Sequence, residues 1–317
     1  MSYTLGIDTS NYTTSVAIYN SEDNSVISSK KLLPVKQGEL GLRQSDAVFE
    51  HTKQFFDVLS ELPTDLLKQI SSVGVSIKPS EQNGSYMPCF LTGKTIADSI
   101  SYILGVPVYY FSHQAGHLMA ALFSSKKIEL LKSEFIAFHV SGGTTDMLYV
   151  SPDQETVFKC SLIGKSLDLK FGQAIDRLGK LFGLPFPSGK YLDELSLNGK
   201  NILDFPKKLI DNNCTVSGFE NKFKKYFQDG ESKEDISASL FNSIADVLIK
   251  MAEKARDKIG SIPVVFSGGV MANTIIREKI SNNMKDVYFA EPQFSSDNAC
   301  GTAILGYYKS VGEIWIL

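Results

Sequence analysis

Apolar and polar residues alternate in two short runs at the start of the chain, YTLGIDTS and TTSVAIYN, which Asn11 and Tyr12 separate. Alternation with a period of two is typical of a strand that buries one face, and two such runs around a polar turn predict a β-hairpin. The same arrangement returns in EFIAFHVSGG followed by TTDMLYVS. The chain therefore carries two similar hairpins, about half its length apart.

The two hairpins correspond position by position, pairing Ser10 with Ser141, Thr13 with Thr144 and Thr14 with Thr145. This duplication predicts an α/β fold of two actin-like or sugar-kinase-like domains, of the ribonuclease-H-like class, that face a central cleft. We expect the first domain over residues 1–128 and the second over 129–303. We also expect a C-terminal helix, 304–317, to pack back on the first domain.

Other segments predict the elements between and after the hairpins. Helical periodicity marks SDAVFEHTKQFFDVLSEL, LTGKTIADSISYILG and NACGTAILGYYKSVG, while SSVGVSIK and PVYYFS are typical of strands and PSEQNGSYMPC of a long loop. The segment FSGGVMANTIIREKI combines a strand, a tight glycine turn and the start of a helix. That combination lets backbone N–H groups approach a phosphate or a nucleotide.

Composition narrows the class of protein. A chain of 317 residues with 43% hydrophobic residues is typical of a globular protein with two domains. Its net charge of −3 gives no electrostatic basis for unaided binding of nucleic acid, and we expect no DNA binding. The four cysteines include no C-x-x-C pair, which argues against a zinc ribbon or a disulfide framework and favours the cytoplasm. No run reaches the roughly 18 apolar residues of a membrane span, so we expect no membrane association.

The motif HQAGH is the strongest candidate for metal chemistry. It places His113 and His117 four residues apart, on one face of a helix, where both rings can point at one ion. Asp297, in SSDNAC, can complete a three-ligand site with an open coordination position. The alternative for a bare HxxxH is one packed and one solvated ring.

Two glycine turns are candidates for nucleotide binding. In SGGTT, Ser141 to Thr145, the glycines remove Cβ atoms that keep an anion from the backbone, although the segment also fits a plain hairpin turn. SGGVMAN repeats this pattern and adds Asn273, whose amide suits a ribose or a base edge. The GKT at Gly93 is no Walker A motif, because Pro88 stands where a glycine is required.

Three further polar side chains lie on predicted strands and helices. Asp8 lies near the end of the first strand, where its carboxylate can hold a metal-bound water or simply cap local N–H groups. His139 lies on an apolar strand and is expected to be a packed core residue. His51 is expected to be a partly exposed helix residue.

A set of motifs resembles the tRNA threonylcarbamoyladenosine transferase family, once described as glycoproteases. They are HQAGHLMAAL, HVSGGTTDMLYV, AIDRLGKLFGLPFPSG, TVSGF, VFSGGVMAN and FSSDNACGTAILGY, in the family's order and over most of the chain. The resemblance implies an actin-like fold, an iron or zinc ion and an acyltransferase. It also implies the transfer of a threonylcarbamoyl group from its adenylate to an adenosine of tRNA.

By position, the resemblance assigns the metal to His113, His117 and Asp297. It assigns the donor adenylate to a loop of His139, Val140, Ser141, Gly142 and Gly143, and the ribose and adenine to Asp176, Gly189 and Asn273. Ser10, the counterpart of Ser141, is included among the expected nucleotide-binding residues. Asp8 is the candidate catalytic base.

The chain departs from the family pattern near the expected reaction centre. Asn11 replaces a cysteine, Tyr12 and Thr13 replace an acidic pair, Thr144 replaces a histidine, and Lys165 and Gln173 replace acids. We therefore interpret the chain as a divergent paralogue, in which Asp8 supplies the base or the acceptor differs from tRNA.

Two classes of function follow. The first is a metal-dependent carbamoyl-type transferase that uses an adenylate donor and acts on tRNA or on another acceptor, within a complex and with a related actin-like partner subunit. The second is a non-catalytic nucleotide-binding subunit that regulates or scaffolds a related complex. A peptidase ranks lowest, because the chain has no H-E-x-x-H and no evident nucleophile–base pair.

Overall fold

A computed structural model describes residues 2–10, 12–34, 42–291, 294 and 298–312. The chain divides into two compact units, which are taken separately below. The first comprises residues 1–133, 151–160 and 293–317, and the second residues 134–150 and 161–292. The sequence analysis placed the boundary after residue 128 and the end of the second domain at 303. The structure assigns residues 151–160, which begin at the end of the second predicted hairpin, to the first unit.

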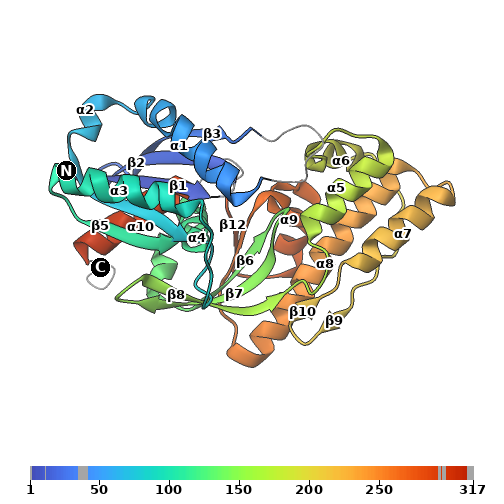
Figure 1. Ribbon diagram of the computed structural model, residues 1–317. Helices are drawn as coiled ribbons and strands as arrows, with labels where there is room; N and C mark the ends of the chain where they lie inside the picture. The colour runs from blue at the N-terminus through green and yellow to red at the C-terminus, as the bar shows by residue number, and fades with distance from the viewer. Residues whose placement is uncertain (1, 11, 35–41, 292–293, 295–297, 313–317) are drawn as a thin grey trace. The chain divides into compact units, whose positions relative to one another are not determined.

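The sheet of the first unit has five strands (Figure 1). They are β1 (Tyr3–Ser10), β2 (Thr13–Asn20), β3 (Ser25–Leu32), β4 (Ile70–Lys78) and β5 (Val108–Ser112), in the order β3-β2-β1-β4-β5. The first three strands run antiparallel, and β4 and β5 run parallel to β1. The predicted hairpin of YTLGIDTS and TTSVAIYN is thus confirmed as β1 and β2.

Helices cover both faces of this sheet. They are α1 (Gln44–Ser60), α2 (Thr64–Leu67), α3 (Phe90–Leu104), α4 (His113–Ser124) and α10 (Asn298–Val311), with a 3-10 turn at Ile128–Lys132. Leu5 and Ile7 face a core shared with α1 and α3. The residue between them, Gly6, faces α10, because a Cβ at Gly6 would lie 2.1 Å from the Ala299 carbonyl oxygen. Alternation along β1 therefore separates the two helical layers.

The second unit repeats this topology. Its strands are β6 (Phe135–Val140), β7 (Thr145–Asp153), β8 (Val157–Lys165), β11 (Val264–Ser267) and β12 (Val287–Phe289), in the order β12-β11-β6-β7-β8. Numbered within the unit, this is the same 3-2-1-4-5 order as in the first, with an antiparallel hairpin and two parallel neighbours. The predicted duplication of an actin-like α/β domain is confirmed.

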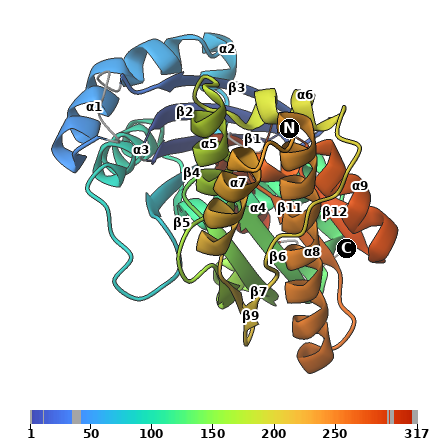
Figure 2. The same cartoon turned by 90° about the vertical axis from the view of Figure 1, so that its right-hand side faces the viewer.

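The second unit contains the long helix α8, which Figure 2 shows. They are α5 (Phe171–Phe182), α6 (Gly189–Ser196), α7 (Ser217–Gln228), α8 (Lys233–Ile259) and α9 (Thr274–Asn283), with a 3-10 turn at Gly269–Ala272 and a short ladder of β9 (Leu209–Ile210) and β10 (Asn213–Cys214). Their core is rich in phenylalanine, with Phe138 and Phe266 stacked at 4.9 Å between ring centroids.

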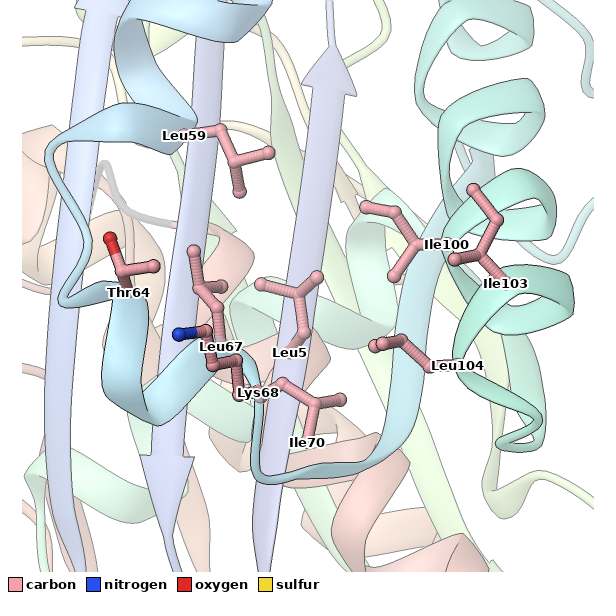
Figure 3. A pocket seen from close by; sticks show the side chains of 9 residues that line it. All are labelled: Leu5, Leu59, Thr64, Leu67, Lys68, Ile70, Ile100, Ile103 and Leu104. Carbon is pink, nitrogen blue, oxygen red and sulfur yellow. The ribbon is translucent and has the colours of Figure 1, made fainter.

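An apolar pocket of about 260 Å³ opens in the first unit (Figure 3). It lies where α2 and the last turn of α3 meet the start of β1 and β4, with Lys68 as its one ionisable lining residue. Its lining contains no His, Cys, Asp or Glu side chain that could bind a metal. Within the described parts of the chain, no helix has the length and apolar character needed to cross a membrane.

Candidate functional site

Two histidines stand at the start of α4 in the first unit. The buried Ser112 caps this helix, its hydroxyl accepting the backbone N–H of Ala115 at 3.1 Å. Because Ser112 also ends β5, the strand delivers His113 to the first position of the helix and His117 one turn later. The sequence prediction of a shared helix face is confirmed, with the two ring centroids 4.4 Å apart.

The Nε2 atoms of the two rings converge. They lie 3.1 Å apart, so that one nitrogen donates a hydrogen bond to the other or both lone pairs point at one cation. Two imidazoles on a tetrahedral zinc ion, with Zn–N bonds of about 2.05 Å, place their nitrogens about 3.3 Å apart. The donor set and its spacing therefore fit a divalent ion.

The third predicted ligand, Asp297, lies outside the described residues. Among the residues that are described, no group of three His, Cys, Asp or Glu side chains is arranged to hold a metal. The three-ligand site consequently stays a prediction.

Asp8 lies behind His113. It is 1% exposed, and its Oδ2 is 3.0 Å from Nδ1 of His113, on the side of the ring away from His117. Its Oδ1 accepts the backbone N–H of Ser10 at 2.9 Å. Burial alone would raise the pKa of the Asp8 carboxyl, but the charge and hydrogen bond of His113, with hydrogen bonds from Ser10 and Ser76, hold that pKa well below its usual range. Asp8 is therefore an anion at neutral pH.

Asn298, which the sequence analysis did not single out, completes this cluster. It is 2% exposed at the first position of α10, and its Nδ2 donates to Oδ2 of Asp8 at 2.7 Å and lies against Nδ1 of His113. Gly116 makes room for the amide, since a Cβ there would lie 2.5 Å from Oδ1 of Asn298. The sequence signal that could have identified Asn298 was its position directly after the predicted ligand Asp297 in SSDNAC.

His51 differs from its prediction. It is fully buried on α1, with Nδ1 2.8 Å from the Thr14 hydroxyl oxygen. The same face of α1 carries Phe55 and Val58, which are buried in the core that α1 shares with β1. Burial lowers the pKa of His51 to about 4, against the attraction of Asp8, so the ring is neutral at pH 7. The prediction that His51 is a partly exposed helix residue was therefore wrong.

In the second unit, the Ser141 loop joins β6 to β7 and lies at the start of α5. The Ser141 hydroxyl accepts the N–H groups of Gly143 and Thr144, each at 3.2 Å, and its carbonyl accepts the N–H of Gly172 at 3.2 Å. A Cβ at Gly172 would lie 2.6 Å from the backbone of Gly142, which explains the glycine in the helix. At Gly142 and Gly143 a Cβ would meet nothing within 4 Å, so their space is open to a ligand.

The second glycine turn lies beside the first. β11 and β6 are parallel neighbours, and Gly268, at φ +96°, comes so close to Val140 that a Cβ would lie 2.3 Å from its carbonyl oxygen. His139 is half-buried rather than a packed core residue, with Nδ1 3.3 Å from the Ser267 hydroxyl oxygen. That hydroxyl donates to the carbonyl of Phe138 at 2.9 Å, so it accepts from His139.

The other predicted nucleotide residues follow in a connected line. Asp176, one turn after Gly172 on α5, accepts the N–H of Ser188 at 2.9 Å, and Gly189 opens α6 directly after it. One turn along α6, Asp193 accepts the side-chain amide of Asn273, which caps α9 by accepting the N–H of Ile276 at 2.9 Å. Burial raises the pKa of both carboxyls, Asp176 and Asp193. Sequence reasoning missed Asp193, although its spacing of four from Gly189 was visible.

At the positions where this chain departs from the family pattern, no other acidic residue takes the place of the missing carboxylates. Tyr12 is 40% exposed, and Thr13 begins β2. Thr144 hydrogen bonds to Ser141 through their hydroxyls at 2.8 Å, and Gln173 accepts the N–H of Lys170 at 3.2 Å at the start of α5. These residues thus have structural contacts of their own.

Comparison with known proteins identifies the family. The family model for tRNA N6-adenosine threonylcarbamoyltransferase (TsaD) matches residues 42–304. The enzyme of that name from Sulfurihydrogenibium sp. (strain YO3AOP1) is 31% identical over 318 residues, which cover 96% of this chain and 90% of the relative. The one from Thermosipho africanus (strain TCF52B) is 32% identical over 323 residues, which cover 96% and 93%.

Solved structures agree on the fold. HypF of T. kodakarensis gives a TM-score of 0.62 at 11% identity, covering all of this chain and 50% of that one. Component A of the (R)-2-hydroxyglutaryl-CoA dehydratase of Acidaminococcus fermentans gives 0.59 at 17% identity, covering 98% and 100%. At these identities the likeness concerns the duplicated actin-like fold alone. The family model and the two close relatives, by contrast, extend over most of the chain, which belongs to the tRNA N6-adenosine threonylcarbamoyltransferase family.

Proposed function

We propose that this chain is a metal-dependent acyltransferase that moves a threonylcarbamoyl or related carbamoyl-type group from an adenylate donor to an adenosine of tRNA, or to a paralogous acceptor. The convergence of Nε2 of His113 and of His117, 3.1 Å apart, carries the proposal. A pair of imidazoles preorganised in this way fits an open-site metal better than it fits a packed core.

In this proposal His113, His117 and Asp297 hold an iron or zinc ion. The ion would supply a Lewis acid at an open coordination position, next to the carbonyl that the acceptor nitrogen attacks. The chain's own residues bind and orient the substrates, which is a separate contribution to the rate.

The second unit would hold the donor. The open space at Gly142 and Gly143, beside the N-terminus of α5, suits the phosphate of an adenylate, because the positive end of a helix dipole stabilises an anion. His139 and Val140 border this loop, and Ser10 is the proposed counterpart in the first unit. Asp176, Gly189 and Asn273 would hold the ribose and adenine through hydrogen bonds.

A net charge of −3 makes a partner subunit necessary for firm tRNA binding in this proposal. A related actin-like chain is the partner we expect. Such a subunit would add the positively charged surface for tRNA that a chain with a net charge of −3 does not supply by itself.

A second candidate is a non-catalytic nucleotide-binding subunit that regulates or scaffolds a related complex. Tyr12 and Thr13 favour it, because neither offers a carboxylate at the turn of the first hairpin. The two candidates share the nucleotide site and differ in group transfer.

The test is transfer of label from radioactive threonylcarbamoyl-adenylate into unmodified tRNA, by the pure protein and again with added cell extract from its source. The proposal expects labelled tRNA, lost in His117→Ala and kept in Asp57→Asn, a change at an exposed carboxylate of α1. Tight adenylate binding without transfer under both conditions would favour the non-catalytic subunit.

A further inference from the structure

His113 has a polar neighbour at each of its two ring nitrogens, on opposite sides of the ring. On one side Nδ1 lies 3.0 Å from Oδ2 of Asp8, and on the other Nε2 lies 3.1 Å from Nε2 of His117. The carboxylate is 1% exposed, whereas the His113 side chain is 26% exposed. The ring is therefore held from its buried side and offers its other nitrogen outward.

The carboxylate decides where the proton of His113 resides. Two groups face Nδ1, the Asp8 carboxylate and the Asn298 amide nitrogen, and that amide donates to the same carboxylate. Because a carboxylate oxygen accepts hydrogen bonds, its approach to Nδ1 favours the proton on that ring nitrogen. In the tautomer with its proton on Nδ1, Nε2 of His113 keeps its lone pair. His117 can then donate from its own Nε2 to this lone pair, or both lone pairs can bind one cation.

Asn298 holds the carboxylate in this orientation. Its Nδ2 donates to the same Oδ2 at 2.7 Å, and Thr302, one turn along α10, donates its hydroxyl proton to the Asn298 carbonyl at 2.9 Å. Gly116 lies between the two histidines on α4, where any Cβ would collide with the amide. The glycine of HQAGH thus serves the placement of Asn298.

We propose that Asp8 and Asn298 are positioning residues for the metal: Asp8 fixes the Nδ1–H tautomer of His113, which presents the Nε2 lone pair to the ion, and Asn298 fixes Asp8. This inference rests on the proposed metal site and extends it to residues behind the ligands. Partners of this kind orient metal-binding histidines and raise their basicity.

The inference separates two roles for Asp8. As a general base it would accept a proton from the acceptor, and its removal would stop transfer but leave the metal bound. As a positioning residue it strengthens metal binding itself. Metal affinity distinguishes the roles without any measurement of transfer.

The experiment titrates metal-free, full-length protein with Zn²⁺ alone, in competition with a chromophoric chelator, and repeats the titration with Fe²⁺ under anaerobic conditions. We expect Asp8→Asn, which keeps the side chain's size, to bind metal about 10- to 100-fold more weakly. Gly116→Ala should weaken binding by displacing Asn298, and Asp57→Asn should match the wild type. Circular dichroism and thermal melting establish that each variant is folded.

Imidazole ¹⁵N NMR of the wild type supplies a measurement that needs no variant. The chain has four histidines, so the spectrum is simple, and His113→Gln assigns the signal. We expect metal-free His113 to carry its proton on Nδ1. A proton on Nε2 would overturn the inference, as would folded Asp8→Asn with wild-type metal affinity. If wild-type protein bound neither ion, the metal site of the proposed function would fail with it, whereas unchanged affinity in the variant would overturn the positioning role alone.

Discussion

Thr14 and Thr145 occupy the same position in the two hairpins, yet each attaches a helix in its own way. Both are fully buried. The Thr14 hydroxyl meets side chains from the middle of α1, accepting the Gln54 amide at 2.7 Å and lying 2.8 Å from His51 Nδ1. The Thr145 hydroxyl accepts a backbone N–H, that of Phe171 at the first position of α5, at 3.2 Å.

The two units therefore share one fold but attach a helix to the hairpin threonine in different ways. In the second unit, attachment through the first N–H of α5 places the helix N-terminus beside the open glycine loop, which suits an anion. In the first unit, the Thr14 hydroxyl instead contacts the buried side chains of His51 and Gln54, from the middle of α1. The two units thus share a strand topology, while the part of the helix that each hairpin threonine contacts differs between them.

The largest expected effect contrasts two hairpin glycines. In Gly6→Ala the new Cβ would lie 2.1 Å from the carbonyl oxygen of Ala299, a backbone atom of α10 that cannot yield easily. We expect a loss of about 3 kcal/mol in the free energy of unfolding, the upper end for overpacking. Gly142→Ala adds a Cβ in open space and should leave stability unchanged while weakening adenylate binding.

Thermal unfolding and calorimetric titration with an adenylate analogue measure these two outcomes. Equal stability of Gly6→Ala and wild type would show that α10 packs less tightly on β1 than the structure indicates. Unchanged adenylate binding by Gly142→Ala would remove the loop from the proposed site.

The next effect compares the two threonines directly. Thr14→Val removes the partner of two buried side chains, and we expect a loss of about 2 kcal/mol, since each buried group left unpaired costs roughly 1–3 kcal/mol. Thr145→Val leaves one backbone N–H unpaired, and we expect about 1 kcal/mol. Chemical denaturation of both variants gives the ranking, and a reversed order would contradict the two modes of attachment.

Local elements were predictable from the sequence, because the signals that fix them are local. Both hairpins and the helix of HQAGH follow from periodicity and turn residues within a dozen positions. The supporting residues were not predictable in this way. Asn298 and Asp8 are 290 residues apart in sequence, and Gly172 matters only because the Ser141 loop packs on it. Contacts of this kind depend on tertiary packing, which periodicity does not encode.

His51 illustrates the same limit. Its polar side chain and its helical position predicted partial exposure, but Thr14 and the sheet bury it completely. A buried neutral imidazole needs a hydrogen-bond partner, and that partner lies 37 residues away, on β2.

The third prediction concerns pH. We expect the stability that His51 contributes at the first hairpin to depend on pH, and no such dependence at the second hairpin. Burial lowers the pKa of His51 from 6.5 to about 4, so the unfolded chain binds a proton in that interval and the folded chain does not. Stability is therefore full above about pH 6.5 and falls as the pH drops toward 4. Between pH 7 and pH 5 we expect a loss of about 2 kcal/mol, because each pH unit in this interval costs at most about 1.4 kcal/mol.

Denaturation of wild type and His51→Asn at pH 7 and pH 5 isolates this contribution, because the variant lacks the titrating ring. Thr145→Val serves as the control and should keep the wild-type dependence, since the partner of Thr145 is a backbone N–H. If His51→Asn and wild type lost the same stability between the two pH values, His51 would not be the titrating group.

The smallest effect on stability tests whether the second unit holds the nucleotide through a side chain or through a helix cap. Asn273 does two things: its Oδ1 caps α9 at Ile276, and its amide faces Asp193. Asn273→Ser keeps a good N-cap and should change stability by only a few tenths of a kcal/mol, whereas Asn273→Ala loses the cap and about 1 kcal/mol of stability.

If the amide binds the nucleotide, both variants should weaken adenine-nucleotide affinity about tenfold, equivalent to about 1.4 kcal/mol, and both should keep the wild-type metal content. If only Asn273→Ala lost affinity in a calorimetric titration, the cap rather than the amide would support the site, and the contrast between a ligand-binding second hairpin region and a metal-supporting first one would rest on the glycine loop alone.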